Sequence, residues 1–146
     1  MRWSVRPARP EDAAVIHRLN REALGYECPP EAVAAQLERV LKRPADRVFV
    51  VWDEDAGHVA GFVHAADYET LHAGSMKNIL SLAVENDRRG LGLGRMLVEA
   101  VETWARADGC EAVRLVSSFG RTHAHGFYLH CGYRLRKEQK NFIKAI

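Results

Sequence analysis

Three glycines alternate with leucines directly after an arginine in segment 89–94, which reads Arg-Gly-Leu-Gly-Leu-Gly. The apolar run 79–84 before it predicts a buried strand, and apolar residues at helical spacing predict a helix over 93–107. A glycine-rich turn exposes backbone N–H groups, and the start of a helix adds the positive end of its dipole. This combination predicts a pyrophosphate site, to which neighbouring arginines would add charge. The alternative is a turn that only makes a tight corner, but such a turn needs fewer glycines.

Two familiar nucleotide-binding loops do not fit this segment. The dinucleotide pattern G-x-G-x-x-G requires a glycine where Arg95 stands, and the Gly-Lys-Ser/Thr of a P-loop is missing. The spacing R-x-x-G-x-G does fit, at Arg89, Gly92 and Gly94. It resembles the acetyl-coenzyme A pyrophosphate loop of the GNAT superfamily of N-acetyltransferases.

A second segment, about thirty residues further on, carries the same resemblance. Ala124, Phe127, Tyr128, Gly132 and Tyr133 follow the spacing A-x-x-F-Y-x-x-x-G-F/Y, which is similar to the second motif of that superfamily. The two motifs stand in the family's order, and a predicted helix and strand separate them. The order of the predicted elements along the whole chain also agrees, so the resemblance covers nearly all of the 146 residues.

The resemblance implies one domain over residues 1–146, of the mixed α/β (α+β) class. Its sheet should be mostly antiparallel and flanked by helices. A central parallel pair of strands, 78–84 and 112–116, should splay apart to admit coenzyme A; the strand–helix–strand order itself predicts parallel pairing. The implied reaction is direct transfer of an acetyl group from acetyl-coenzyme A to a primary amine of a small molecule, without a covalent enzyme intermediate and without a metal.

The resemblance also implies roles for single residues. Backbone groups of Leu82, Ala83 and Val84 would pair with the pantetheine arm, and an N–H there would polarise the thioester carbonyl. Tyr128 would protonate the leaving sulfur, because a phenol with a pKa of roughly 10 is protonated at pH 7. A packing role is the alternative for this tyrosine. The pyrophosphate would contact Arg89, Gly90, Leu91, Gly92, Leu93, Gly94 and Arg95.

The base that accepts the amine's proton is the point at which the sequence departs from the pattern. Many members of the family carry a glutamate near position 80, where this chain has Leu80. Asp67, Glu69 and His72 are the candidates from the sequence, and a water chain is a further alternative. Because an alkyl amine with a pKa near ~10 is almost wholly charged at pH 7, desolvation or a proton relay is needed.

Three functions are compatible with these motifs. Acetylation of a small amine is the main hypothesis, and acidic residues near 67–69 would suit a cationic acceptor. Acetylation of a protein N-terminus or lysine shares the same donor site but requires an open groove for a peptide. The missing glutamate also permits a sensor that binds acyl-coenzyme A without turnover.

Composition limits the partners and the compartment. A chain of 146 residues with 47% hydrophobic residues can bury about two-thirds of its surface. A net charge of +2 without a dense basic stripe argues against nucleic acid as a partner. No apolar run approaches the ~20 residues of a membrane span, and the first six residues lack the apolar region of a signal peptide, so we expect a cytoplasmic protein. The three cysteines have no C-x-x-C spacing, which favours reduced thiols over a metal site.

Periodicity and turn residues predict the remaining elements. A first strand covers 3–6, and two helices follow, one beginning near Glu11 and one at Pro30. Strands at 47–52 and 59–68 form a hairpin, the helix at 93–107 ends before Gly109, and a short helix covers 122–130. Segment 133–143 should close the sheet as a strand or hairpin. With Phe142 and Ile146 on one face of such an edge strand, a homodimer is a further expectation.

Overall fold

Five strands form one mixed sheet in the part of the chain that ends at Val116. The computed structural model describes residues 2–146, which divide into this unit and a second one, Ser117–Ile146. The second unit contains the helix α4 (Thr122–His130). In chain order the first unit contains β1 (Trp3–Pro7), η1 (Pro10–Asp12), α1 (Ala13–Leu24), α2 (Pro30–Leu41), β2 (Asp46–Asp53), β3 (His58–Tyr68), β4 (Met76–Val84), η2 (Asn86–Arg88), α3 (Leu93–Ala107) and β5 (Ala112–Leu115).

The strands lie side by side in sequence order, from β1 to β5. The first four pair antiparallel, and β5 pairs parallel to β4. Helix α3 provides the crossover connection that a parallel pair requires. These pairings confirm the mixed, mostly antiparallel class. The expected central position of the parallel pair is wrong, because β5 is the last strand of the sheet in the described residues.

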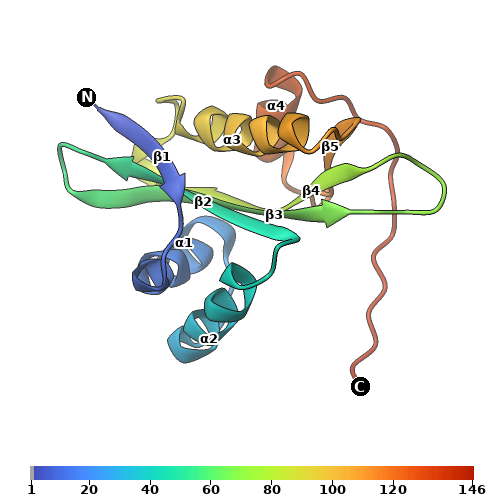
Figure 1. The fold of residues 1–146 in the computed structure, drawn as a ribbon. Coiled ribbons are helices and arrows are strands. Elements are labelled where there is room, and N and C mark those ends of the chain that lie inside the picture. Colours follow the sequence, from blue (N-terminus) through green and yellow to red (C-terminus); the bar gives the residue numbers. More distant parts are fainter. Residues whose placement is uncertain (1) are drawn as a thin grey trace. The chain divides into compact units, whose positions relative to one another are not determined.

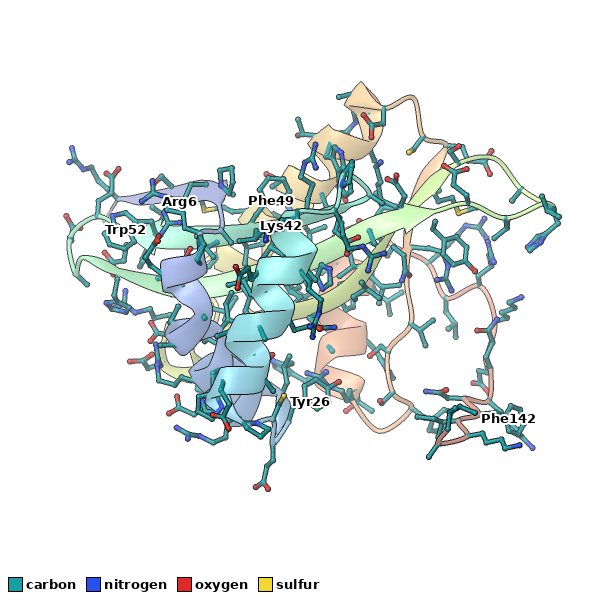
Figure 2. All side chains as sticks on the ribbon, turned by 60° about the horizontal axis from the view of Figure 1, so that its bottom comes forward. Arg6, Tyr26, Lys42, Phe49, Trp52 and Phe142 are labelled. Carbon is teal, nitrogen blue, oxygen red and sulfur yellow. The ribbon has the colours of Figure 1, made fainter. Side chains whose placement is uncertain are left out.

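The helices cover opposite faces of the sheet, with α1 and α2 on one face and α3 on the other (Figure 1). Figure 2 shows the side of α1 and α2, where the guanidinium carbon of Arg6 lies 5.5 Å from the ring centroid of Trp52. Alternate residues of the strands face these helices, because successive side chains of a strand point to opposite faces. The apolar core on this face includes Ile16, Leu19, Val33, Leu37, Val40, Val48, Val50, Phe62 and Ala83. Helix α3 buries Leu93, Leu97, Val98, Val101 and Ala105 against the other face.

An irregularity interrupts the ladder between β3 and β4. Ala65 pairs with Ile79 and His64 pairs with Ser81, so Leu80 is an extra residue on β4. A β-bulge of this kind bends its strand and changes which backbone groups face each neighbour. The bulge lies at the position where the parallel pairing with β5 ends, at Ile79.

In the second unit, α4 ends at the predicted residue, followed by Gly132 in a left-handed conformation (φ 93°). Segment 133–146 contains no helix or strand, so the predicted closing strand at 133–143 is wrong. Five of the seven residues 134–140 are charged, a composition that strands disfavour, and Phe142 is 87% exposed. The homodimer loses the strand on which it was expected to depend, and it stays a prediction without that support.

Candidate active site

The predicted phosphate loop connects β4 to α3 through two left-handed glycines. Gly90 has φ 82° and Gly92 has φ 86°, values that side-chain-bearing residues rarely adopt. A Cβ atom added at either glycine would have no other atom within 4 Å, so the space in front of the backbone is open. The backbone at these two glycines is therefore open to close approach by a ligand.

The first turn of α3 supplies the N–H groups expected of an anion site. The first bond within the helix runs from the N–H of Met96 to the carbonyl of Gly92 (3.1 Å), so the amides of Leu93 and Gly94 have no acceptor inside the helix. The first turn contains no acidic residue, and it includes Arg95. The side chain of Arg89 is exposed beside it. Dipole and side-chain charge are both favourable to pyrophosphate.

Arg88 has a different role from the two arginines that follow it. Its side chain binds Asp53 and the carboxylate of Glu85, the latter at 3.1 Å, which ties the loop to the β2–β3 hairpin. Glu85 also accepts from Arg18 (3.0 Å) and lies 2.9 Å from His58. Burial by itself raises the pKa of Glu85, but the hydrogen bonds and charges of His58 and Arg18 outweigh it and the pKa is lowered. This carboxylate is therefore a charged anchor for the start of the loop.

The edge of β4 is unpaired beside the loop. β4 pairs with β3 along its whole length, but with β5 only from Met76 to Ile79. From Leu80 to Val84, no strand in the described residues lies on the β5 side. The parallel pair thus separates at the carboxyl end of β4, next to the glycine loop, as the resemblance implied.

The phase of the ladder shows which β4 backbone groups face this gap. The N–H of Glu85 donates to the carbonyl of Ala60 (2.9 Å), and bonded and non-bonded pairs alternate along an antiparallel ladder. Ala83 therefore directs its backbone groups to β3, whereas Leu82 and Val84 direct theirs to the side that β5 has left. Of the three predicted residues, these two can meet a ligand with backbone groups, and Ala83 contributes a side chain that is 3% exposed.

Tyr128 lies on α4, within the second unit. Its ring makes edge-to-face contacts with Phe127 (centroids 5.1 Å apart) and Tyr133 (5.9 Å). Burial raises the pKa of Tyr128 to about 12, against a smaller opposing effect of the Arg121 charge. The phenol is therefore protonated at neutral pH, as a proton donor must be.

None of the three residues proposed from the sequence is placed as the base. Asp67 lies on the α3 face, where its carboxylate binds the buried Lys77 (2.5 Å). Glu69 accepts from the hydroxyl of Ser75 (2.9 Å), and His72 is exposed in the turn before β4. Leu80, at the family's glutamate position, is 53% exposed.

His64 is a candidate base that the sequence did not reveal. It lies on β3, on the face of α1 and α2, directly opposite Ser81, which belongs to the part of β4 that has no β5 partner. Its Nε2 lies 2.7 Å from a carboxylate oxygen of Asp46, which is 6% exposed and also pairs with Arg43 (3.2 Å). In a neutral ring that donates from Nε2, Nδ1 keeps a lone pair that can accept a proton. The sequence signal is a histidine within the apolar part of a strand, between Val63 and Ala65.

Residues 13–133 match the model of the acetyltransferase (GNAT) family. The chain belongs to this family. The aminoalkylphosphonate N-acetyltransferase of Salmonella typhimurium is 30% identical over 136 residues, which cover 91% of this chain and 82% of the relative. An uncharacterized N-acetyltransferase of Bacillus subtilis, YhdJ, is 28% identical over 105 residues, or 72% of each chain. These matches identify the protein as an N-acetyltransferase and confirm the resemblance to the GNAT family.

The fold of this GNAT acetyltransferase agrees with solved structures. AAC(6')-Iy, solved with the bisubstrate analogue CoA-S-monomethyl-acetylneamine, superimposes with a TM-score of 0.87 at 17% identity, with complete coverage of both chains. AAC(6')-Ih of Acinetobacter baumannii gives 0.86 at 13% identity, with 99% coverage of each. Within residues 2–146, no three His, Cys, Asp or Glu side chains gather as a metal site would require. No helix of the described chain has the length and apolar character needed to cross a membrane.

Proposed function

We propose that this GNAT protein transfers an acetyl group from acetyl-coenzyme A to the primary amine of a small molecule. The observation that carries the proposal is the loop at Gly90 and Gly92, which opens its backbone beside both the α3 N-terminus and the unpaired edge of β4. Pyrophosphate would bind the loop, and the pantetheine arm would lie along Leu82 and Val84. Acetyl-coenzyme A supplies the acyl group as a thioester.

The residues of this chain would then move two protons. The amine nitrogen forms a bond to the acetyl carbon while the carbon–sulfur bond breaks, and an N–H at Leu82 or Val84 stabilises the negative charge on the carbonyl oxygen. His64, oriented by Asp46, would take the proton from the amine directly or through a water molecule. Tyr128 would donate its proton to the leaving sulfur. The products are the N-acetylated amine, which is an amide, and free coenzyme A.

A small acceptor is favoured over a protein because a relative that is 30% identical over 91% of this chain is named as an aminoalkylphosphonate N-acetyltransferase. The test is a panel of primary amines with acetyl-coenzyme A, in which released thiol is measured by colour and the acetylated product by mass spectrometry. Gly92→Ala serves as a variant that should lose donor binding. Thiol release without acetylated product, or no turnover with any amine, would contradict the proposal. Binding of acetyl-coenzyme A without turnover would leave the sensor as the better function.

A further inference from the structure

Five polar residues lie on the face of α1 and α2, on strands β3, β4 and β5. We call them the β3–β5 polar cluster: His64, Tyr68, Asn78, Ser81 and Arg114. Ala66 pairs with Asn78, and Asn78 pairs with Arg114, so the three share one face of the sheet. On β3, residues 64, 66 and 68 alternate onto that same face. It is the face that carries Phe62 and Ala83 of the apolar core.

Arg114 is the cation of this cluster. Its guanidinium donates to the side-chain oxygen of Asn78 (2.6 Å) and lies 4.2 Å from the ring centroid of Tyr68. In the described part of the chain it forms no ion pair with a carboxylate, whereas the partly buried Arg6 binds Asp12 and the partly buried Arg18 binds Glu22 and Glu85. Arg114 is itself only partly exposed. A guanidinium has five N–H donors, so the bond to Asn78 leaves a fork that can bind a planar or tetrahedral anion.

The position of Arg114 relates it to the proposed reaction. Its partner Asn78 is one residue before Ile79, where β4 and β5 cease to pair. From Asn78 to Leu82 the strand advances roughly 10–13 Å. A short aminoalkyl chain with its nitrogen at the thioester covers part of this separation, and the long side chain of Arg114, with its hydrogen bonds to the anionic group, covers the rest. His64 lies on the same face, on the side of Leu82.

We propose that Arg114, held by Asn78 and Tyr68, binds an anionic group of the acceptor amine. This inference rests on the proposed function, because it concerns the second end of the same substrate. A phosphonate or phosphate is the favoured anion, since its oxygens accept two parallel N–H bonds from one guanidinium, and a carboxylate shares this chemistry. The acceptor class is then a short amine with a terminal oxyanion, and not a polycation. This changes the expectation that acidic residues near 67–69 select a cationic acceptor, because Asp67 is bound to Lys77 on the opposite face.

The experiment compares two acceptors of similar length, 2-aminoethylphosphonate and the neutral n-propylamine. Arg114→Gln should lower kcat/KM for the phosphonate by about 10- to 100-fold, mainly through KM, because charge-assisted bonds are lost. The value for propylamine should stay within about threefold. Arg114→Lys keeps the charge but loses the forked pair of N–H donors, so its kcat/KM for the phosphonate should lie between those of wild type and Arg114→Gln. Arg47→Gln is the matched control, since Arg47 also lies over an aromatic ring, that of Trp104 (5.2 Å), but on the α3 face.

Each alternative outcome has a distinct meaning. If Arg114→Gln lowers kcat/KM equally for both acceptors, Arg114 is a structural residue and the inference is overturned. An unchanged kcat/KM for both acceptors would also overturn the inference. Wild-type turnover of propylamine with no preference for the phosphonate would refute the inference while the proposed function stands. If the wild type acetylates no amine at all, the proposed function fails. Calorimetric binding of 2-aminoethylphosphonate to wild type and to Arg114→Gln then decides the anion site, and equal affinities or no binding overturn it.

Discussion

Replacement of Gly92 by alanine should have two effects, a loss of stability from backbone strain and a loss of affinity for coenzyme A, and these can be measured separately. Gly92 has φ 86°, and a Cβ added there would meet no atom within 4 Å. The substitution therefore costs only the conformational penalty, about 1 kcal/mol of unfolding free energy. For a chain of this size, that corresponds to a fall in Tm of about 4 °C. Gly109→Ala is the matched control, because Gly109 has φ 70° and equally open surroundings at the other end of α3.

The two variants should differ in their affinity for coenzyme A. The new Cβ of Gly92→Ala occupies the open side of the loop, so at least one hydrogen bond to the pyrophosphate should be lost. A charge-assisted hydrogen bond contributes about 1.5–3 kcal/mol, which predicts a Kd raised about 10- to 100-fold. Gly109→Ala should lose the same stability and keep its affinity. Isothermal titration with coenzyme A, together with thermal unfolding, measures both quantities. Equal Kd values for wild type and a folded Gly92→Ala protein would refute the assignment of the loop.

Further variants test the proton transfers and the charged anchors. Tyr128→Phe should keep its Kd for coenzyme A and lower kcat about 10²-fold; a loss below about threefold would assign the ring to packing. Since the pKa of Tyr128 is about 12, the 295 nm difference between wild type and this variant should stay flat up to about pH 11. His64→Gln should lower kcat about 10²-fold and Asp46→Asn by less, and an unchanged kcat for His64→Gln would require another base. Burial alone would raise the pKa of Asp12, but the hydrogen bonds from the Arg6 side chain and the Arg9 backbone N–H, with the charges of both arginines, lower it below the ordinary 3.8. Its charge therefore stabilises the fold above that pH, and the effect is lost as the pH falls through the lowered value. Asp12→Asn should cost about 3 kcal/mol in urea unfolding at pH 7, and this difference should shrink below pH 3.8; a constant difference would contradict the sign.

The parts of the site that depend on local sequence could be predicted. The glycine loop and the start of α3 at Leu93 follow from glycine spacing next to a helical period, and both signals lie within about twenty residues. Helix α4 and the turn at Gly132 were predicted for the same reason. The strand at 133–143 failed because a few alternating apolar residues do not outweigh a charged run that has no pairing partner.

The acceptor side of the site could not be predicted, because its residues meet only through strand register. A hairpin continued from the pair Asp53–His58 would place residue 47 opposite His64. The shift between Val51 and Trp52 instead places Val48 there, and so brings Asp46 onto the face of His64. The bulge at Leu80 changes the register of β4 in the same way. A ladder continued from the pair Ala65–Ile79 would place Leu80 opposite His64, but the bulge places Ser81 there, and Leu82 and Val84 then direct their backbone groups to the open edge.

These two irregularities also explain how a base can be supplied without the family's glutamate. Leu80 stands at that position but is the extra residue of the bulge, and in the proposed mechanism His64 of the neighbouring strand takes the place of a carboxylate there. A histidine one strand away reaches the same gap only if its register is fixed, and the bond to the buried Asp46 fixes its ring as well. The catalytic proposal and the anion site at Arg114 thus depend on one feature, the phase of β4 relative to β3 and β5. Deletion of Leu80 would remove the bulge and shift that phase, and it should abolish turnover while leaving the loop at Gly92 able to bind coenzyme A.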